Sequence, residues 1–150
     1  MATLFLLVGL PGSGKTTLAR QLARERGALV LSADEWMSRI VRDGWDAERR
    51  AAVQEVQFEI ALEVLQIGGD VVLDFGLFHR QERDRYRARA VEHGALTKTL
   101  YLDVPRDELL RRLRARNANL PPHTFTVDEA HLDNCMGWFQ PPTQDELDER

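Results

Sequence analysis

Residues 4–18 read LFLLVGLPGSGKTTL, and this stretch decides the fold. Leu4 to Val8 form an apolar run that is too short to cross a membrane and long enough for a buried strand. Gly9 to Thr16 follow as GLPGSGKT, a full match to the phosphate-binding pattern GxxxxGK[ST]. The pattern requires a strand before it and a helix after it, and the sequence predicts both. The stretch therefore predicts a loop that binds the phosphates of a nucleotide; the alternative is a glycine-rich turn with an incidental lysine.

Each residue type of this loop has a physical task. Glycines let the backbone turn tightly, so that successive N–H groups converge on anionic oxygens. Lys15 can reach the β- and γ-phosphates, and the Thr16 hydroxyl is placed to hold Mg²⁺. The helix that begins here adds its positive end. We expect the following residues to contact ATP: Gly9, Leu10, Pro11, Gly12, Ser13, Gly14, Lys15, Thr16 and Thr17.

Length and composition restrict the class of protein. A chain of 150 residues is predicted to form a single domain with a real hydrophobic core. The net charge of −4 counts against a protein that coats nucleic acid. The single cysteine, Cys135, excludes an internal disulfide and is expected to be an inert structural thiol. Residues 1–8 lack the basic start of a signal peptide, so we expect a cytoplasmic protein with no membrane segment.

Strand and helix signals alternate along the chain. Short apolar strands are expected at 4–8, 28–31, 71–74 and 97–104. Helices are expected at 15–26, from Ser32 to Gly44, at 47–67, 80–93 and 105–116, and from the capping box at Thr126 to about Met136. Three sequences have the form of a capping box, and they begin at Ser32, Thr126 and Thr143. In the helix at 47–67, one apolar series recurs at helical spacing: Val53, Val56, Ile60, Val64 and Ile67.

This alternation predicts an α/β fold in which helices cover both faces of a mostly parallel sheet of four strands, or five. Ligands of such sheets bind at the carboxyl ends of the strands. Those ends are expected at 9–15, 32–35, 74–79 and 103–105. The candidate chemical groups therefore converge on one edge.

Two acidic residues follow the second and third expected strands. Phosphoryl transfer to a hydroxyl needs a carboxylate that accepts or orients the proton, and Asp34 is the candidate. The alternative is that Asp34 only complements the positive end of its helix. Asp74 ends the third strand, where an acid can hold Mg²⁺ together with Thr16. The alternative for Asp74 is a turn residue that caps the next loop.

Arg112 and Arg116 lie four residues apart, on one flank of a helix whose buried face is expected at Leu109, Leu110 and Leu113. A loop follows them at 117–125. From that position they can swing onto the γ-phosphate and offset charge in the transition state. We expect residues 106–126 to form a lid and at least one of these arginines to be catalytic. The alternative is a solvated arginine face.

Other residues allow a structural or a functional interpretation. The helix at 80–93 contains many arginines, and we expect by default that they form a face exposed to solvent. The sharper alternative is that Arg80 or Arg83 contacts an anionic substrate. Trp36 and Trp45 could line a substrate pocket, although aromatic residues are more often part of a core. Residues 138–139, Trp-Phe, could flank a nucleotide base, with packing as the stronger expectation.

Five stretches together resemble a known family: GLPGSGKTTLAR, LSADEW, VVLDFGLFHRQERD, YLDVPRDELLRRLRARN and WFQPPTQDEL. The sequence resembles the small AAA-type P-loop kinase family, which is similar to chloramphenicol phosphotransferase, the zeta toxins and the 5′-kinase domain of bacteriophage polynucleotide kinase. The resemblance implies a P-loop NTPase fold, a three-layer sandwich, with ATP and Mg²⁺ as cofactors. It implies Lys15 and Thr16 at the phosphates, Asp34 as general base, and Arg112 or Arg116 as the lid arginine.

The sequence departs from that family at two points. Polynucleotide kinases carry an arginine three residues after the base, and Met37 stands there in this chain. A small hydroxyl-bearing acceptor is therefore favoured over a polynucleotide 5′-hydroxyl, and an ATP-binding switch with little turnover is the alternative from another class. The usual fifth strand is expected to be missing or supplied by a partner, so we expect a monomer or a weak homodimer.

Overall fold

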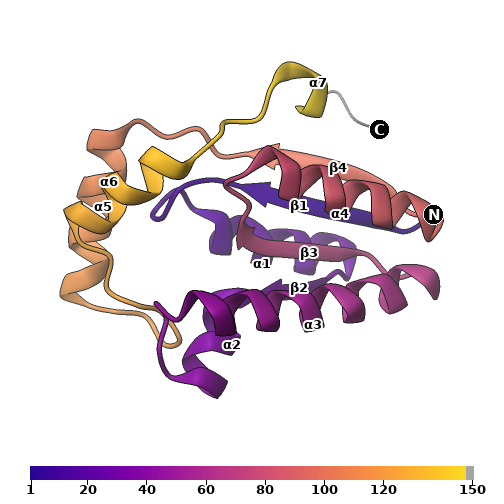
Figure 1. Ribbon diagram of the computed structural model, residues 1–150, viewed down its shortest axis with the longest axis horizontal. Helices are drawn as coiled ribbons and strands as arrows, with labels where there is room; N and C mark the ends of the chain where they lie inside the picture. Colours follow the sequence, from indigo (N-terminus) through magenta and orange to yellow (C-terminus); the bar gives the residue numbers. More distant parts are fainter. Residues whose placement is uncertain (148–150) are drawn as a thin grey trace.

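The computed structural model describes residues 1–147 and has three layers (Figure 1). Its strands are β1 (Thr3–Val8), β2 (Leu29–Ser32), β3 (Val71–Gly76) and β4 (Leu96–Tyr101). They form one sheet in the order β2-β3-β1-β4, and every pairing is parallel. Helix α1 (Lys15–Arg26) covers one face, and α3 (Ala47–Gln66) and α4 (Arg80–Glu92) cover the other. The predicted α/β sandwich is confirmed, with four strands in the described part of the chain.

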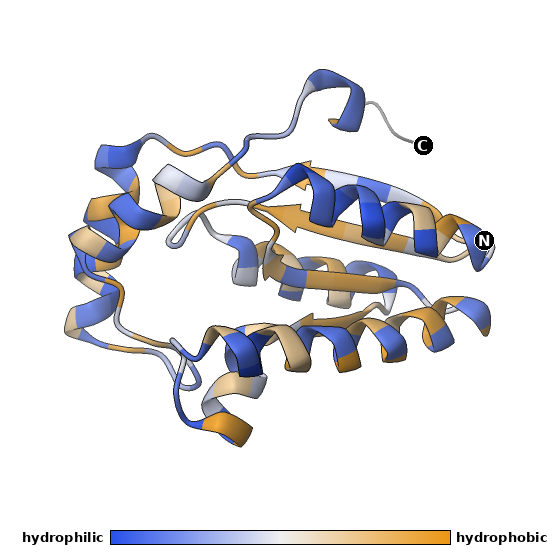
Figure 2. Cartoon of the chain, viewed as in Figure 1, coloured by the Kyte–Doolittle hydropathy of each residue, from blue (hydrophilic) through white to orange (hydrophobic). Residues whose placement is uncertain are grey.

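Strand β1 lies between β3 and β4, and all six of its residues are buried. Alternate side chains point to opposite faces of a strand, so the run must be apolar throughout to contact helices on both sides. Leu4 and Leu6 pack in the cluster that contains Phe58 of α3, whereas Phe5 packs with Leu22 of α1. Figure 2 shows the central strands as the most hydrophobic part of the molecule and the helices as mixed.

The other helices lie near the carboxyl ends of the strands or beside the sheet. They are α2 (Ala33–Trp36), the π-helix η1 (Met37–Val41), α5 (Arg106–Ala118), α6 (Glu129–Trp138) and α7 (Gln144–Leu147). Helices α5 and α6 pack together beyond the ends of the strands, and α7 lies beside β4 (Figure 1). Among residues 1–147, no helix combines the length and the apolar character needed to span a bilayer.

The helix after β2 begins as predicted and ends differently. Ser32 accepts a hydrogen bond from the Glu35 backbone N–H at 3.4 Å, which is the capping interaction. The helix then changes to a π-turn, which the sequence did not predict, and ends at Val41. Arg42, with φ 64°, reverses the chain two residues before the predicted break at Gly44. Gly44 has a different role, because a Cβ there would lie 2.6 Å from the Phe125 ring.

The apolar series recognised in the sequence of α3 is not the face that this helix buries most completely. Val56 is 48% exposed and Ile67 is 86% exposed, whereas α3 buries Phe58, Ala61, Leu62 and Leu65 together with Gln57. Two apolar series with helical spacing overlap in this helix. The series containing Phe58 faces the sheet because its ring packs against Tyr86 of α4, with ring centroids 4.4 Å apart.

The capping predictions near the C-terminal end had mixed outcomes. Helix α6 is capped by Asp128, which accepts from the His131 N–H at 2.8 Å, and not by Thr126. The reason is that Asn117 bonds both backbone polar groups of Val127, at 2.8 and 3.2 Å, and this fixes the chain just before the cap. The sequence beginning at Thr143 does form part of a capping box, since the Thr143 N–H donates to Glu146 at 2.9 Å.

Candidate active site

Residues 9–14 connect β1 to α1, and together with the first turn of α1 they have the backbone geometry of an anion cradle. Gly12 and Gly14 have φ values of 85° and 98°, which a residue with a side chain rarely adopts. A Cβ at Gly9 would lie 2.5 Å from the Ser13 hydroxyl oxygen, so a larger residue would displace the turn. The N-cap residue of α1 is Gly14, which has no side chain to cap the helix. The first N–H groups of that helix are therefore available to phosphate oxygens.

The remaining loop residues divide into exposed and packed positions. Thr16 and Thr17 are exposed in the first turn of α1, as a phosphate contact requires. Leu10 is buried against Leu109 of α5 and Cys135 of α6, so its side chain packs and only its backbone faces the loop. Pro11 is half-buried. Burial raises the pKa of the Cys135 thiol, which agrees with the predicted inert thiol.

Lys15 places a cation inside the loop. Its Nζ donates to the carbonyl oxygens of Gly9 and Leu10, at 2.9 and 3.1 Å. Burial lowers the pKa of Lys15, and the carboxylates of Asp74 and Asp34 oppose that shift. The guanidinium of Arg116 adds to the lowering. The four side chains that the sequence assigned to different motifs therefore lie within electrostatic reach of one another.

Thr16 and Asp74 form the candidate metal site. The Thr16 hydroxyl donates to Asp74 Oδ2 at 3.1 Å, and Asp74 is only 8% exposed. Burial raises the pKa of Asp74, and Lys15 and the Thr16 hydrogen bond oppose the rise. Both groups are hard oxygen ligands of the kind that Mg²⁺ prefers. Residues 1–147 contain no cluster of three or more His, Cys, Asp or Glu side chains that could hold a metal ion. A magnesium ion here would thus complete its coordination with phosphate oxygens and water, as Mg²⁺ does in kinase sites.

Asp34 lies in the first turn of α2, with its side chain 58% exposed at the carboxyl end of β2. Its Oδ1 accepts from Arg50 Nη2 at 2.7 Å, and the same nitrogen donates to the Gly44 carbonyl at 3.0 Å. Arg50 is the functional candidate that sequence reasoning missed. Its helix starts at the same edge of the sheet, and that position was the available signal, but a pair of adjacent arginines is typical of a solvated face.

Arg112 and Arg116 share one flank of α5, as predicted, and extend to different places. Arg112 Nη1 lies 3.4 Å from the carbonyl oxygens of Gly12 and Ser13, above the phosphate loop. Arg116 Nη2 lies 3.4 Å from the Phe125 carbonyl oxygen, and its Nε is buried with no hydrogen-bond partner among the described residues. Burial lowers the pKa of Arg116, and Asp34 opposes this shift. One arginine therefore covers the loop and the other approaches the candidate base.

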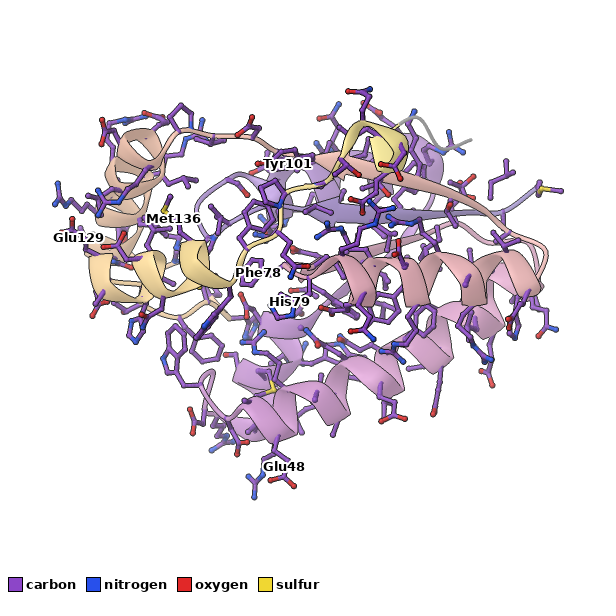
Figure 3. The ribbon with its side chains drawn as sticks, turned by 45° about the horizontal axis from the view of Figure 1, so that its top comes forward. Glu48, Phe78, His79, Tyr101, Glu129 and Met136 are labelled. Atoms are coloured by element: carbon purple, nitrogen blue, oxygen red, sulfur yellow. The ribbon has the colours of Figure 1, made fainter. Side chains whose placement is uncertain are left out.

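The segment after α5 packs against the residues that follow α2. Phe125 packs against Gly44, and the Trp45 ring stacks on the His131 ring with centroids 4.2 Å apart. Trp36 packs against the core cluster beneath α3, as the structural interpretation predicted. In Figure 3, Phe78 and His79 lie at the centre of the view, between α6 and α4. The contacts of Phe125 and His131 therefore bring the predicted lid and α6 against residues 44–45.

A cavity of about 330 Å³ lies on the other side of the loop, next to β4. Leu10, Tyr101, Phe139 and Pro141 are among the residues that line it. Phe139 packs edge-on against Phe78 and Tyr101, with centroids 6.0 and 5.8 Å apart, whereas Trp138 is 60% exposed. Of the two aromatic residues proposed to flank a base, only Phe139 lines this cavity.

The solvated arginine face expected on α4 is present only in part, because Arg85 and Arg89 are exposed whereas other arginines of the helix are buried. Arg83 is fully buried and Arg87 is 7% exposed, and both bond Glu146 of α7. Arg80 pairs with Asp84 and Asp145. The partners of these arginines in α7 are about sixty residues away in sequence, so no local sequence pattern could predict the pairing. These arginines hold the fold together, and neither Arg80 nor Arg83 lies free to contact a substrate.

Comparisons with known proteins agree with this geometry. Residues 4–142 match the AAA domain family. A shikimate kinase from Paracidovorax citrulli is 32% identical over 121 residues, which make up 72% of this chain and 60% of that protein. An adenylate kinase from Mesoplasma florum is 29% identical over 126 residues, 74% of this chain and 58% of that protein. The chain thus spans less than two thirds of the length of these two relatives.

A solved structure supports the fold. The APS kinase of Mycobacterium tuberculosis, in complex with AMPPNP and APS, superposes with a TM-score of 0.68. The superposition covers 95% of this chain and 84% of that one at 21% sequence identity, so it speaks for the fold alone. The resemblance found in the sequence is confirmed by the family match and the relatives. The chain therefore belongs to the AAA domain family and, within it, to the small AAA-type P-loop kinases.

Proposed function

We propose that this protein is an ATP-dependent phosphotransferase that moves the γ-phosphoryl group of ATP onto a hydroxyl of a small molecule. The observation that carries the proposal is the convergence of Lys15, Asp34, Asp74 and Arg116 at the carboxyl ends of β1, β2 and β3. That arrangement puts a cation in the phosphate loop, a candidate metal site beside it and a carboxylate opposite. The two kinase relatives support the same class of reaction for this chain.

In this reaction the acceptor oxygen attacks the γ-phosphorus and loses its proton to the Asp34 carboxylate. The bond from the γ-phosphorus to the bridging oxygen breaks, and ADP leaves with that electron pair. Lys15 offsets charge on the phosphates, and the N–H groups of the loop and of α1 hold their oxygens. Mg²⁺, held by Thr16 and Asp74, would neutralise charge on the β- and γ-phosphates. Arg50 keeps the Asp34 carboxylate turned towards the acceptor.

The lid assigned to residues 106–126 supplies two further positive charges to the proposed site, those of Arg112 and Arg116. Arg112 already lies over the loop, and Arg116 has a buried nitrogen without a partner among the described residues. A γ-phosphate oxygen is a suitable acceptor for that N–H. We assign Arg116 the transition-state role and Arg112 a role in holding the loop.

The acceptor side favours a small molecule. Met37 is fully buried, so the position where polynucleotide kinases carry an arginine belongs to the core of this protein. The Phe125 ring also packs against Gly44, so a bulky apolar side chain lies next to the residues that follow α2. The nucleotide base would occupy the cavity beside Phe139. A cytoplasmic location and a monomer or weak homodimer complete the proposal.

The test is phosphate transfer from Mg·ATP to a panel of hydroxylated antibiotics, sugars, nucleosides and 5′-hydroxyl oligonucleotides. Asp34→Asn should lower transfer to the accepted compound by a factor on the order of a hundred to ten thousand, because it removes the proton acceptor. Mg·ATP binding should stay nearly unchanged. Glu35→Gln is the matched control, since it removes one carboxylate from the same helix turn and should keep full activity.

Three outcomes would change the proposal. Full activity of Asp34→Asn removes this residue from the mechanism. Transfer to oligonucleotides alone makes the protein a polynucleotide 5′-kinase. Slow ATP hydrolysis that no acceptor accelerates identifies a nucleotide-binding switch.

A further inference from the structure

Residues 140–147 return from α6 across the start of α4, and we name them the C-terminal clasp. The Gln140 N–H donates to the Phe78 carbonyl at 2.8 Å, and the Gln140 side chain accepts from the Arg80 N–H at 2.8 Å. Helix α7 then lies beside β4 (Figure 1). The clasp is thus bonded to the turn that follows β3. That turn lies at the carboxyl ends of the strands, beside the candidate active site, and we call this side of the sheet the active edge.

Glu146 is the buried centre of the clasp. It is 1% exposed, and Arg83, its bidentate partner, is fully buried. Arg83 Nε and Nη2 donate to the two carboxylate oxygens at 2.7 and 3.2 Å. Arg87 Nη2 donates to the same carboxylate at 2.8 Å, and Arg87 Nη1 reaches Thr99 of β4 at 3.0 Å. The carboxylate therefore joins α7, α4 and the edge strand.

Arg83 extends this network to the active edge. Its third nitrogen, Nη1, donates to the Leu77 carbonyl at 2.8 Å. Leu77 is 1% exposed and has a φ of 55°, a left-handed conformation that a leucine adopts only when its surroundings impose it. The preceding residue, Gly76, accepts from the N–H of Gly9, the first glycine of the phosphate loop, at 3.3 Å. A continuous chain of contacts thus connects Glu146 to the phosphate loop.

Stability alone is a weak explanation for these buried charges. Replacing a buried ion pair by apolar side chains is often neutral or stabilising, because the charges lose their hydration. Here the pair does something that an apolar contact would not do, since its hydrogen bond fixes one carbonyl at a strained turn. Backbone strain of this kind is concentrated at functional sites.

We propose that Glu146 and Arg83 are positioning residues that hold the turn 76–79 in the conformation that aligns the acceptor with the phosphate loop. The inference rests on the proposed phosphotransferase function. Neither residue touches a reacting atom. Arg83 acts through the Leu77 carbonyl, and Glu146 acts by orienting Arg83.

The test compares Glu146→Gln with two controls. Asp145→Asn removes a neighbouring carboxylate of the clasp that is 67% exposed and pairs only at the surface. Leu65→Ala lowers stability from the far side of the core, where Leu65 is 3% exposed. For each variant we would measure the Kd of Mg·ATP, the turnover of Mg·ATP with and without the acceptor panel, and amide hydrogen exchange over residues 76–79.

Glu146→Gln should lower turnover by a factor on the order of ten to a hundred, as misplacement of a reacting group does. Exchange at the turn should become faster, while the Kd of Mg·ATP changes by less than about threefold. Both controls should keep wild-type turnover, even though Leu65→Ala lowers Tm. If Glu146→Gln fails to fold, Arg83→Lys replaces it, because a lysine keeps the charge but lacks the planar fork that bonds the Glu146 carboxylate bidentately while a third nitrogen bonds Leu77.

Unchanged turnover and exchange in a variant with a lower Tm would overturn the inference and leave the clasp a purely structural device. Failure of the proposed function is recognised separately. In that case the wild-type protein transfers phosphate to no acceptor, and hydrogen exchange and Mg·ATP hydrolysis still decide whether Glu146 positions the turn.

Discussion

Two groups of charged side chains lie at the two ends of the turn after β3, and they are built differently. The clasp group, Arg83, Arg87 and Glu146, is almost fully buried, and its three contacts to the carboxylate are 2.7 to 3.2 Å long. The active-edge group consists of Lys15, Asp34, Arg50, Asp74 and Arg116. Among residues 1–147, the only short ion pair of this group is Arg50 with Asp34, and Arg116 keeps a buried N–H without a hydrogen-bond partner.

This difference separates two uses of charge. Buried charges that are paired with opposite charges fix the relative positions of helices and strands. Few of their hydrogen-bond donors and acceptors remain available to a ligand. Incompletely matched charges leave hydrogen-bond donors available, and an anionic ligand can complete them. The same residue type, arginine, therefore holds the scaffold on α4 and is available for chemistry on α5.

The largest effect on activity is expected when the active-edge group loses Arg116, whose Nε–H has no hydrogen-bond partner among the described residues. Arg116→Ala should lower phosphate transfer by a factor on the order of a thousand, the range found for arginines that stabilise phosphoryl transfer. Arg114→Ala is the control, because that side chain is 70% exposed and lies 3.8 Å from Glu129. Single-turnover kinetics with Mg·ATP would measure the change. An Arg116→Ala enzyme with wild-type kcat would show that the unmatched nitrogen has no part in catalysis.

A smaller effect, on stability, is expected when the clasp group is broken. Glu146→Gln removes the carboxylate partner of the buried Arg83 and one of the two carboxylate partners of Arg87, and it should destabilise the protein by about 3 to 5 kcal/mol. Urea denaturation would measure this loss. Retention of the wild-type unfolding midpoint would show that the clasp does not contribute to stability.

The clasp also predicts how stability depends on pH. Burial opposes ionisation of Glu146, but the hydrogen bonds from Arg83, Thr143 and Arg87 outweigh it and hold the pKa at about 2, below the ordinary 4.5. The contribution of this carboxylate is therefore complete above pH 4.5 and is lost as the pH falls towards 2. Glu146→Gln should flatten the acid limb of the stability curve over that interval. The same acid limb in both proteins would contradict the assignment.

The smallest effect concerns Arg50, which pairs with the candidate base. Arg50→Ala should lower kcat on the order of tenfold, because Asp34 keeps its charge and loses its fixed orientation. Arg49→Ala is the neighbouring control, with a side chain 69% exposed. A change in the KM for ATP without a change in kcat would place Arg50 in nucleotide binding instead.

Local patterns predicted the phosphate loop, the parallel sheet and the cap at Ser32, because each depends on residues close together in sequence. Predictions failed where a distant residue decides. Asn117 fixes Val127 and moves the start of α6 to Asp128, and the Phe58–Tyr86 contact selects between two apolar series in α3. The π-turn at Met37–Val41 has no recognisable sequence signal.

In the candidate site, too, residues placed by local sequence patterns could be proposed, whereas residues placed by distant contacts could not. Lys15, Thr16, Asp34 and Asp74 could be proposed as candidates because each lies near the carboxyl end of a strand, and parallel strands end at one edge. Arg50 could not be found because its role depends on where α3 begins relative to α2. The burial of Arg83 could not be predicted because its carboxylate partner lies 63 residues further along the chain.

The most direct test of the central claim is calorimetric titration of Mg·ATP into the wild-type protein and into Lys15→Ala, with Lys98→Ala as the control. Lys98 is the only other lysine, and it is exposed on β4. The account predicts that Lys98→Ala binds like the wild type and that Lys15→Ala binds roughly tenfold to a hundredfold more weakly, as expected for the loss of a charge-assisted contact. Absence of heat with the wild-type protein, or equal affinity in Lys15→Ala, would contradict the claim that this loop holds the triphosphate.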